Sequence, residues 1–377
     1  MFKNILTIVG TRPNFIKVTQ FARHLHRPEK GIHHKLLHTG QHYDDKMSRV
    51  FFEQFGLHPD FWLNVEPGSP NTQIGHIILG VERIVRDSFR PDLILVTGDV
   101  NSTLAAALAA HKLGIPLGHI ESGLRSFDKT MPEEWNRILT DELSDFLFVT
   151  EQSGMAHLER EGKSKDSVFF VGNTMIDTLV AFESDIQASD ILQRLNLQDR
   201  PYALMTMHRP ATVDHQEELE RLIEMVKWLC SEQELVFPIH PRTKNNLEKF
   251  GLYDELINTP GLSITGPLDY FSFQHLIAHS HFVLTDSGGI QEETTFRQVP
   301  CLTLRPNTER PSTCEIGTNT LLPFELPQIK DLISSIRNNT YKGGVVPPLW
   351  DGQATKRIAD IIFQKRIPHH GVLNPGR

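Results

Sequence analysis

Residues 282–310 read FVLTDSGGIQEETTFRQVPCLTLRPNTER, and this stretch decides the fold. A short apolar run at 282–284 leads into the turn Asp286-Ser287-Gly288-Gly289, and we expect the next helix to open with Gln291-Glu292-Glu293. Such a turn binds phosphate in open α/β sheets, because a helix N-terminus carries about half a positive charge and glycines let an anion approach closely. Glu293 is placed to accept two ribose hydroxyls, so a sugar nucleotide is the first ligand to expect. The alternative is that Ser287-Gly288-Gly289 only caps a helix.

Similar apolar runs alternate with helical patterns along the whole chain. They lie at 5–9, 36–38, 93–96, 117–120, 146–149 and 168–171 in the first half, and at 203–207, 235–238, 262–264, 282–284 and 301–304 in the second. Their nearly continuous hydrophobicity is typical of parallel strands that are buried on both faces. Helical patterns include 102–113, 216–229, 328–336 and 354–364, and a polar helical connector is expected at 184–200.

These patterns predict an α/β protein with two doubly wound, Rossmann-like domains that face a cleft. A chain of 377 residues is too long for one ordinary core, which also favours two domains. We expect an N-terminal domain over 1–172 and a C-terminal nucleotide-binding domain over 173–353. The last helix, within about 354–377, is expected to pack back on the N-terminal domain.

The composition argues against several classes of function. A formal net charge of −8 disfavours broad binding to nucleic acid or to membrane surfaces. The cysteines, Cys230, Cys301 and Cys314, are odd in number and lack metal-ligand spacing, so neither disulfides nor a metal site are expected. No secretory signal and no apolar stretch of membrane-spanning length is apparent, which predicts a cytoplasmic protein.

Ionisable side chains follow the expected strands at their carboxyl ends, where doubly wound domains bind ligands. In the first half these side chains are Arg12, Lys17, His42, Asp99 and Glu121, and in the second half they are His208, His240 and Arg242. Glu121 directly follows a buried strand and therefore needs a partner or a ligand.

Several of these residues also have a purely structural interpretation. Thr130-x-x-Glu133, with Pro132 between, fits a capping box that opens a helix running to Leu143. Asp99 fits an Asx-turn or a cap on the helix at 102–113. Arg12 fits a structural ion pair, although its place in a Gly-x-x-Pro turn favours anion binding. The residues alone leave these alternatives open.

Ten segments together resemble the non-hydrolysing UDP-N-acetylglucosamine 2-epimerases, which interconvert UDP-GlcNAc and UDP-ManNAc. They are GTRPNFIK (10–17), TGQH (39–42), GDVNST (98–103), HIESGLRSFDKTMPEEWNR (119–137), VGNTMIDTL (171–179), HRP (208–210), IHPRT (239–243), LTDSGGIQEE (284–293), NTERP (307–311) and DGQA (351–354). They occur in order and at the spacing of the family. The resemblance implies the glycosyltransferase-B architecture, in which two Rossmann-like domains face a cleft.

The resemblance also implies a role for individual residues. The catalytic group comprises Asp99, Glu121, Glu133 and His208, of which the histidine assists the departing UDP. The group that binds UDP or the substrate comprises Arg12, Lys17, His42, Phe273, Ser287, Gly288, Gly289, Glu293 and Arg310. In the family reaction the C2 proton leaves while UDP departs from C1, and UDP adds back to the resulting glycal. Because one base must act on each face of C2, several carboxylates are needed, whereas no metal and no nicotinamide cofactor is expected.

The departures from the family pattern do not involve the proposed catalytic residues. They therefore bear on which sugar is bound and not on the type of reaction. Asn14 stands where glutamate is common, and Pro210 replaces the usual second arginine of the histidine motif. The main alternative is a UDP-2,3-diacetamido-2,3-dideoxyglucuronate 2-epimerase. A glycosyltransferase of the same architecture would also bind UDP at Ser287–Gly289, but it would not need three carboxylates in the first half. A non-catalytic sugar-nucleotide sensor would need none of the catalytic group. We expect a UDP-sugar substrate and a homodimer.

Overall fold

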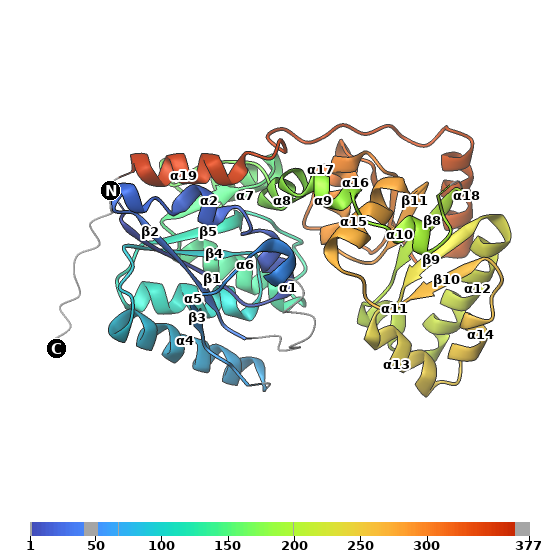
Figure 1. Cartoon of the computed structure of the whole chain (residues 1–377), viewed down its shortest axis with the longest axis horizontal. Coiled ribbons are helices and arrows are strands. Elements are labelled where there is room, and N and C mark those ends of the chain that lie inside the picture. The colour runs from blue at the N-terminus through green and yellow to red at the C-terminus, as the bar shows by residue number, and fades with distance from the viewer. Residues whose placement is uncertain (1, 41–51, 67, 199, 366–377) are drawn as a thin grey trace. The chain divides into compact units, whose positions relative to one another are not determined.

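The structure is a computed structural model and describes residues 2–40, 52–66, 68–198 and 200–365. The chain divides into two compact units (Figure 1). Unit 1 comprises Met1–Ala181 together with Pro348–Arg377, and unit 2 comprises Phe182–Pro347. Each unit contains its own parallel sheet and its own hydrophobic core.

The sheet of unit 1 has the order β3-β2-β1-β4-β5-β6-β7, and every pairing is parallel. In that order the strands are β3 (Phe61–Trp62), β2 (His33–His38), β1 (Asn4–Val9), β4 (Leu93–Thr97), β5 (Leu117–Ser122), β6 (Phe146–Val149) and β7 (Val168–Phe170). From β1 the chain adds β2 and β3 on one side. It then returns to the other side of β1 and adds β4, β5, β6 and β7 in order. The strand order therefore reverses between β1 and β4, which is where a doubly wound sheet forms a binding crevice.

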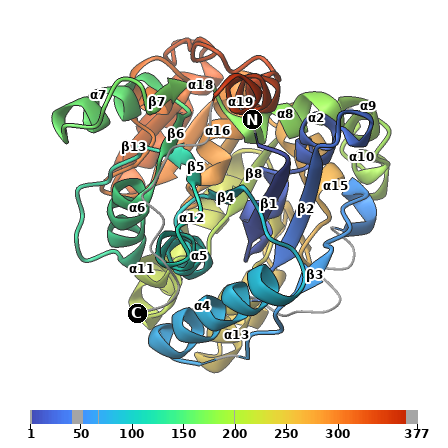
Figure 2. The same ribbon diagram turned by 90° about the vertical axis from the view of Figure 1, so that its left-hand side faces the viewer.

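Helices cover both faces of this sheet (Figures 1 and 2). On one face α4 (Pro70–Asp87) and α5 (Asn101–Lys112) bury their apolar sides against alternate residues of β1 and β4. On the other face α2 (Phe21–Leu25) contacts β2 and also the last helix, α19 (Ala354–Gln364). The strands are buried on both faces, which accounts for their continuous hydrophobicity.

Specific contacts attach α19 to the rest of unit 1. Asp177 in α8 (Thr174–Ala181) accepts the backbone N–H groups of Ala354 at 3.0 Å and Thr355 at 2.6 Å. The Trp350 indole donates to the Thr150 carbonyl oxygen at 2.9 Å. Asp177 thus satisfies two N–H groups that the first turn of a helix leaves without intrahelical partners.

Asp177→Ala should lower the free energy of unfolding by about 2–4 kcal/mol, because two buried N–H groups would lose their acceptor. Denaturant unfolding monitored by circular dichroism measures this loss. Asp360→Ala, at an exposed position of the same helix, is the control and should change stability by less than about 0.5 kcal/mol. Equal stability of the two variants would contradict this role of Asp177.

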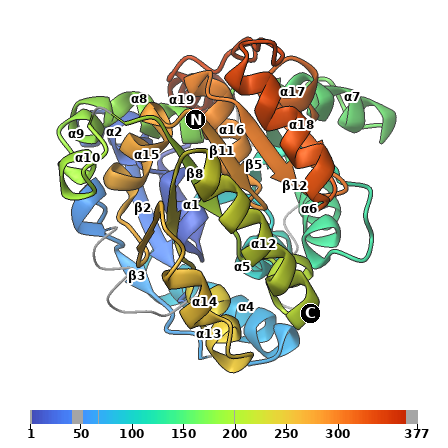
Figure 3. The ribbon, with the colours of Figure 1, turned by 90° about the vertical axis from the view of Figure 1, so that its right-hand side faces the viewer.

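Unit 2 repeats the same sheet order as β10-β9-β8-β11-β12-β13, again with parallel pairings only. The strands are β10 (Leu262–Thr265), β9 (Glu234–Pro238), β8 (Tyr202–Thr206), β11 (Phe282–Thr285), β12 (Cys301–Leu304) and β13 (Asn319–Leu322). Met205 and Phe282 face a core with α12 (Gln216–Glu232) and α18 (Leu326–Arg337), whereas Leu204 and Val283 face one with α15 (Tyr270–His279) and α16 (Gly289–Arg297) (Figure 3). The reversal of strand order lies between β8 and β11.

The expected doubly wound α/β fold is confirmed in both sheets. Two edge strands, β3 and β13, were not predicted. β3 is only two residues long, too short to produce a recognisable pattern. β13 reads NTLL and begins with two polar residues, so it lacks a continuous apolar run. The connector predicted at 184–200 is helical, as expected, and it consists of α9 (Glu183–Gln187) and α10 (Ile191–Arg194). It is not wholly polar, because Ile191 and Leu197 are buried in the core of unit 2.

No helix within the described residues is long and apolar enough to cross a membrane. Within the same residues, no group of three or more His, Cys, Asp or Glu side chains is arranged to hold a metal ion. All three cysteines are free thiols.

Candidate functional site

Several predicted site residues follow the strands on either side of each reversal of strand order. In unit 1, Arg12 and Lys17 follow β1 and Asp99 follows β4, whereas Glu121 is the second-last residue of the next strand, β5. In unit 2, His208 follows β8, and Ser287 to Gly289 follow β11. Each unit therefore presents its own cluster of polar groups at its crevice. His42 lies outside the described residues.

The loop after β1 is held by Asn14, which lies in α1 (Arg12–Ile16). The Asn14 Oδ1 atom accepts the N–H groups of Gly10 and Thr11, both at 3.2 Å, and its Nδ2 donates to the Thr97 carbonyl oxygen at 3.1 Å. A glutamate could not donate to Thr97, so asparagine here ties the β1 loop to the end of β4. Gly10 is required by space, because a Cβ atom would lie 2.1 Å from Ser102 Oγ.

Lys17 and Glu121 form an ion pair, and both side chains are buried. Glu121 has a φ of 71° and interrupts the regular pairing of β5 with β6. A non-glycine residue in this region is strained and must be held by its surroundings, a condition that is frequent at active sites. The partner that the buried carboxylate requires is thus Lys17, which the resemblance had placed near the diphosphate. The ammonium group thus supplies the counter-charge to a carboxylate that is almost fully buried.

Asp99 pairs with Arg137 and does not cap α5. The Arg137 Nη1 atom lies 2.5 Å from Asp99 Oδ2, and Asn136 Nδ2 donates to the Asp99 carbonyl oxygen at 2.8 Å. Both partners come from α6 (Pro132–Leu143). The residue before the first turn of α5 is Val100, and no side chain caps this helix. The structural interpretation of Asp99 as a helix cap was therefore wrong.

Arg137 is itself held by Glu134, which lies 2.7 Å away and accepts the N–H groups of Ser126 and Phe127. Burial opposes ionisation of Glu134, but these hydrogen bonds and the guanidinium keep its pKa below the ordinary value. Arg137 was not predicted as a site residue, because nothing in the sequence indicates which of the nearby arginines reaches Asp99.

Glu133 does not form a capping box with Thr130. The Thr130 hydroxyl donates to Asp128 Oδ1 at 2.6 Å, and α6 begins after Met131 without a side-chain cap. Glu133 is half-buried in the first turn of α6 and has no hydrogen bond or ion pair with any described residue. Its carboxylate therefore has no partner among the described residues, whereas the carboxylates of Asp99 and Glu121 are each paired with a cation.

In unit 2, a buried aspartate orients His208. Asp286 Oδ1 lies 3.0 Å from His208 Nδ1, while Oδ2 accepts the N–H groups of His208 at 2.9 Å and Arg209 at 2.8 Å and the Thr212 hydroxyl at 2.9 Å. Burial opposes ionisation, but His208 and these donors hold the pKa of Asp286 below its ordinary value. The sequence analysis gave Asp286 no role. The pairing of β8 with β11, which a doubly wound order implies, is the signal that could have found it.

Guanidinium groups surround the Ser-Gly-Gly turn. α16 begins at Gly289, earlier than predicted, with Gly288 preceding its first turn. A Cβ atom at Gly288 would lie 2.9 Å from Glu309 Oε1, 3.3 Å from Arg310 Nη1 and 3.4 Å from Arg305 Nη1. Glu309 pairs with both arginines, and Arg310 Nε also lies 2.7 Å from Glu292 Oε2. Arg305, which was not predicted, thus lies beside the predicted Arg310 at this turn.

Glu293 lies one turn into α16 and is 5% exposed. Burial raises the pKa of Glu293 to about 7. Phe273, on the neighbouring α15, is half-buried and packs against the core cluster below it. A buried carboxylate and an apolar ring thus lie on adjacent helices.

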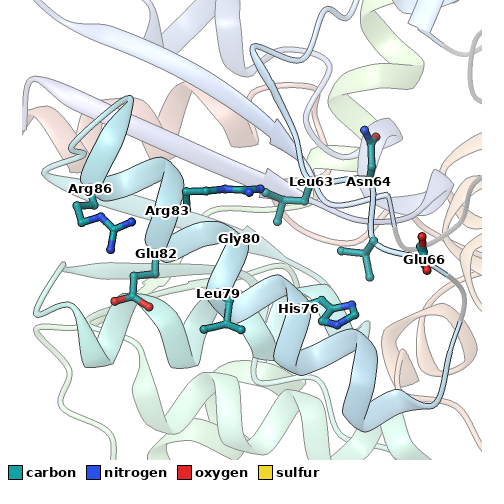
Figure 4. A pocket seen from close by; sticks show the side chains of 10 residues that line it. Leu63, Asn64, Glu66, His76, Leu79, Gly80, Glu82, Arg83 and Arg86 are labelled. Carbon is teal, nitrogen blue, oxygen red and sulfur yellow. The ribbon is translucent and has the colours of Figure 1, made fainter.

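A separate pocket of about 640 Å³ lies on unit 1 between α4 and the segment that follows β3. Its lining includes Leu63, His76, Leu79, Arg83 and Arg86, and Figure 4 shows how the α4 side chains project around it. None of the predicted site residues lines this pocket.

Comparisons with known proteins agree on one family. Residues 24–363 match the family model described as UDP-N-acetylglucosamine 2-epimerase. The UDP-N-acetylglucosamine 2-epimerase of Methanococcus maripaludis is 38% identical over 369 residues, which cover 96% of this chain and 98% of the relative. The UDP-2,3-diacetamido-2,3-dideoxy-D-glucuronate 2-epimerase of Pseudomonas aeruginosa is 35% identical over 368 residues, covering 95% and 99%.

Solved structures show the same similarity. The crystal structure of the Methanocaldococcus jannaschii UDP-GlcNAc 2-epimerase in complex with UDP-GlcNAc and UDP has a TM-score of 0.86 and 36% identity, covering 96% of this chain and 99% of that one. The calicheamicin glycosyltransferase CalG4 has a TM-score of 0.54 at 13% identity over 97% of this chain and 95% of its own, which is a likeness of fold alone.

Proposed function

The chain belongs to the UDP-N-acetylglucosamine 2-epimerase family, and we propose that it interconverts UDP-GlcNAc and UDP-ManNAc by inverting C2 of the sugar. The observation that carries this proposal is the cluster of carboxylates at the crevice of unit 1. Glu121 pairs with Lys17, Asp99 pairs with Arg137, and Glu133 remains open to a ligand. Glycosyl transfer to an acceptor has no use for three such groups, whereas removal and return of a C2 proton does.

In the proposed reaction a carboxylate removes the C2 proton while the C1–O bond to UDP breaks, which leaves a glycal. UDP then adds back at C1, and an acid delivers a proton to the opposite face of C2. Asp99, Glu121 and Glu133 supply the acid and base groups, and Asp99 and Glu121 each lie beside a cation. His208, oriented by Asp286, balances the negative charge that develops on the departing diphosphate. No redox cofactor enters this scheme, because a proton and not a hydride moves.

We place UDP at the crevice of unit 2. The turn formed by Ser287, Gly288 and Gly289 receives the diphosphate, with Arg310 beside it. Glu293 accepts the ribose hydroxyls, and Phe273 lies against the uracil. Arg12, Lys17 and His42 of the first unit complete the proposed set of substrate-binding residues.

Incubation with UDP-GlcNAc alone, followed by separation of the products, tests the proposed function. We expect UDP-ManNAc to form without an acceptor. Formation of free ManNAc and UDP would indicate a hydrolysing enzyme, and recovery of unchanged substrate would contradict the proposal.

The 35% identity to the Pseudomonas aeruginosa enzyme supports a second candidate, a UDP-2,3-diacetamido-2,3-dideoxyglucuronate 2-epimerase. The two candidates share the chemistry at C1 and C2 and differ in the groups at C3 and C6. Comparison of kcat/KM for both substrates decides between them, and we expect the larger value for UDP-GlcNAc. A larger value for the diacetamido uronate would reassign the substrate and leave the reaction unchanged.

Affinity for UDP-GlcNAc should depend on pH through Glu293, whose pKa is raised to about 7. Above this pH the ionised carboxylate accepts two ribose hydroxyls, and below it protonation removes acceptor capacity. KM should therefore rise as the pH falls from about 8 to about 6. UDP-GlcNAc suits this measurement because its diphosphate diester does not change charge in this range. In Glu293→Gln, KM should be high and independent of pH, and a flat profile for the unaltered protein would contradict the role of Glu293.

We further propose that the protein acts as a homodimer in the cytoplasm and supplies an activated sugar for cell-surface polysaccharide synthesis. Sedimentation equilibrium tests the oligomeric state, and a concentration-independent monomer mass would contradict the dimer.

A further inference from the structure

A chain of buried polar groups connects the two strand ends that present Asp99 and Glu121. His119, in β5, is fully buried, and its Nε2 atom lies 2.8 Å from the Gly98 carbonyl oxygen. Its Nδ1 atom lies 2.6 Å from Oδ1 of Asp141, which is also fully buried and belongs to α6. None of these contacts involves a residue assigned so far to the reaction.

Asp141 is held as a hydrogen-bond acceptor. Its Oδ2 atom accepts the Gly123 N–H at 3.0 Å and lies 2.7 Å from Arg125 Nη2. Burial opposes ionisation, but His119 and Arg125 keep the pKa of Asp141 below its ordinary value. The Gly98 carbonyl oxygen can only accept. Both ring nitrogens of His119 therefore face oxygen atoms that are held as acceptors.

Gly98 lies next to both of the proposed bases Asp99 and Glu121. The Gly98 N–H donates to the Ile120 carbonyl oxygen at 3.1 Å, and its own carbonyl oxygen accepts from His119. Gly98 has a φ of 71°, and a Cβ atom there would lie 3.3 Å from Glu121 Oε2. The next residue is Asp99. One imidazole thus fixes the peptide group that precedes Asp99 against the strand that carries Glu121.

We propose that His119 and Asp141 are a positioning pair that sets the spacing between Asp99 and Glu121 for proton transfer at C2, an inference that rests on the proposed function. The ring touches no substrate and exchanges no proton with it. Its effect is geometric, since a displacement of about 1 Å in a catalytic group lowers the rate by about 100-fold. His119 and Asp141 make no hydrogen bond or ion pair with the described residues that are proposed to bind UDP, so UDP affinity should change little when the pair is altered.

The test compares His119→Gln and Asp141→Asn with His34→Gln. His34 is a buried histidine of the same sheet, and its Nε2 lies 2.8 Å from the Thr7 hydroxyl near the amino end of β2. It controls for the loss of a buried imidazole away from the site. We expect kcat to fall about 10- to 100-fold in both test variants, with KM and UDP affinity within about twofold of the original. His34→Gln should keep its kcat even where it lowers Tm as much.

The double variant His119→Gln/Asp141→Asn should be no slower than the slower single variant, because the two residues act as a unit. Unchanged kcat in the single variants, or equal loss in His34→Gln, would overturn the proposal. So would a parallel loss of UDP affinity, or failure of both test variants to fold while His34→Gln folds. If the unaltered protein fails to epimerise UDP-GlcNAc, the proposed function fails first, and retained activity in His119→Gln refutes the positioning pair alone.

Discussion

Glu121→Gln, Asp99→Asn and Glu133→Gln should each lower kcat by about 100-fold or more while UDP still binds with nearly its original affinity. An amide keeps the shape of the side chain but cannot take up or deliver the C2 proton at neutral pH. The loss should appear in kcat and kcat/KM together, because proton transfer contributes in the transition state and not in ground-state binding. Steady-state kinetics and UDP titration by calorimetry measure the two quantities.

Stability separates this loss of chemistry from a loss of structure. Glu121→Gln leaves the buried Lys17 without its counter-charge, and breaking such a pair costs about 3–5 kcal/mol. The double variant Lys17→Met/Glu121→Gln should recover part of this stability and remain inactive. Asp92→Asn is the matched control, since Asp92 accepts the N–H groups of Lys3 and Asn4 at the opposite end of the sheet. Near-normal turnover in all three amide variants would exclude these residues as acid and base.

Asp286→Asn should lower kcat by about 100- to 1,000-fold, close to the loss expected for His208→Ala. The carboxylate of Asp286 holds His208 Nδ1 at 3.0 Å and accepts the backbone N–H groups of His208 and Arg209. An amide presents a donor or a neutral acceptor in its place, so the imidazole loses the partner that orients it. Departure of UDP should then become slower.

The control for Asp286 is Thr212→Val, which removes one donor to Oδ2 and leaves the contact with His208 intact. We expect less than about a fivefold loss of kcat in this variant. A second comparison uses Asp286→Asn combined with His208→Ala, which should be no slower than His208→Ala alone. Full activity of Asp286→Asn, or additive losses in the double variant, would contradict the proposed orientation of His208.

The fold was predictable wherever burial on both faces leaves a continuous apolar run, as at β4, β8 and β11. The predicted C-terminal helix, 354–364, has the same bounds as α19. The edge strands β3 and β13 were not predicted, because β3 is only two residues long and β13 begins with two polar residues. The segment after α8 appeared polar because its few apolar residues, which fill a core, lie among charged ones.

The sequence predicted which candidate residues lie at strand ends and glycine turns, but it did not predict their pairings. Which cation meets which carboxylate depends on contacts between residues far apart in sequence, such as Lys17 with Glu121 and His208 with Asp286. Neither Glu133 nor Asp99 takes part in a helix cap, because other residues bind the groups that a cap would use. Asp128 takes the Thr130 hydroxyl, and Arg137 takes the Asp99 carboxylate.

The central claim is that C2 loses its proton and regains one from an acid of the protein. Turnover of UDP-GlcNAc in D₂O tests this claim most directly, because a carboxylic acid that exchanges with solvent delivers deuterium. Mass spectrometry and proton NMR of the isolated UDP-ManNAc should show one deuterium at C2 and none elsewhere on the sugar ring. UDP-ManNAc that forms in D₂O with only protium at C2 would contradict the account.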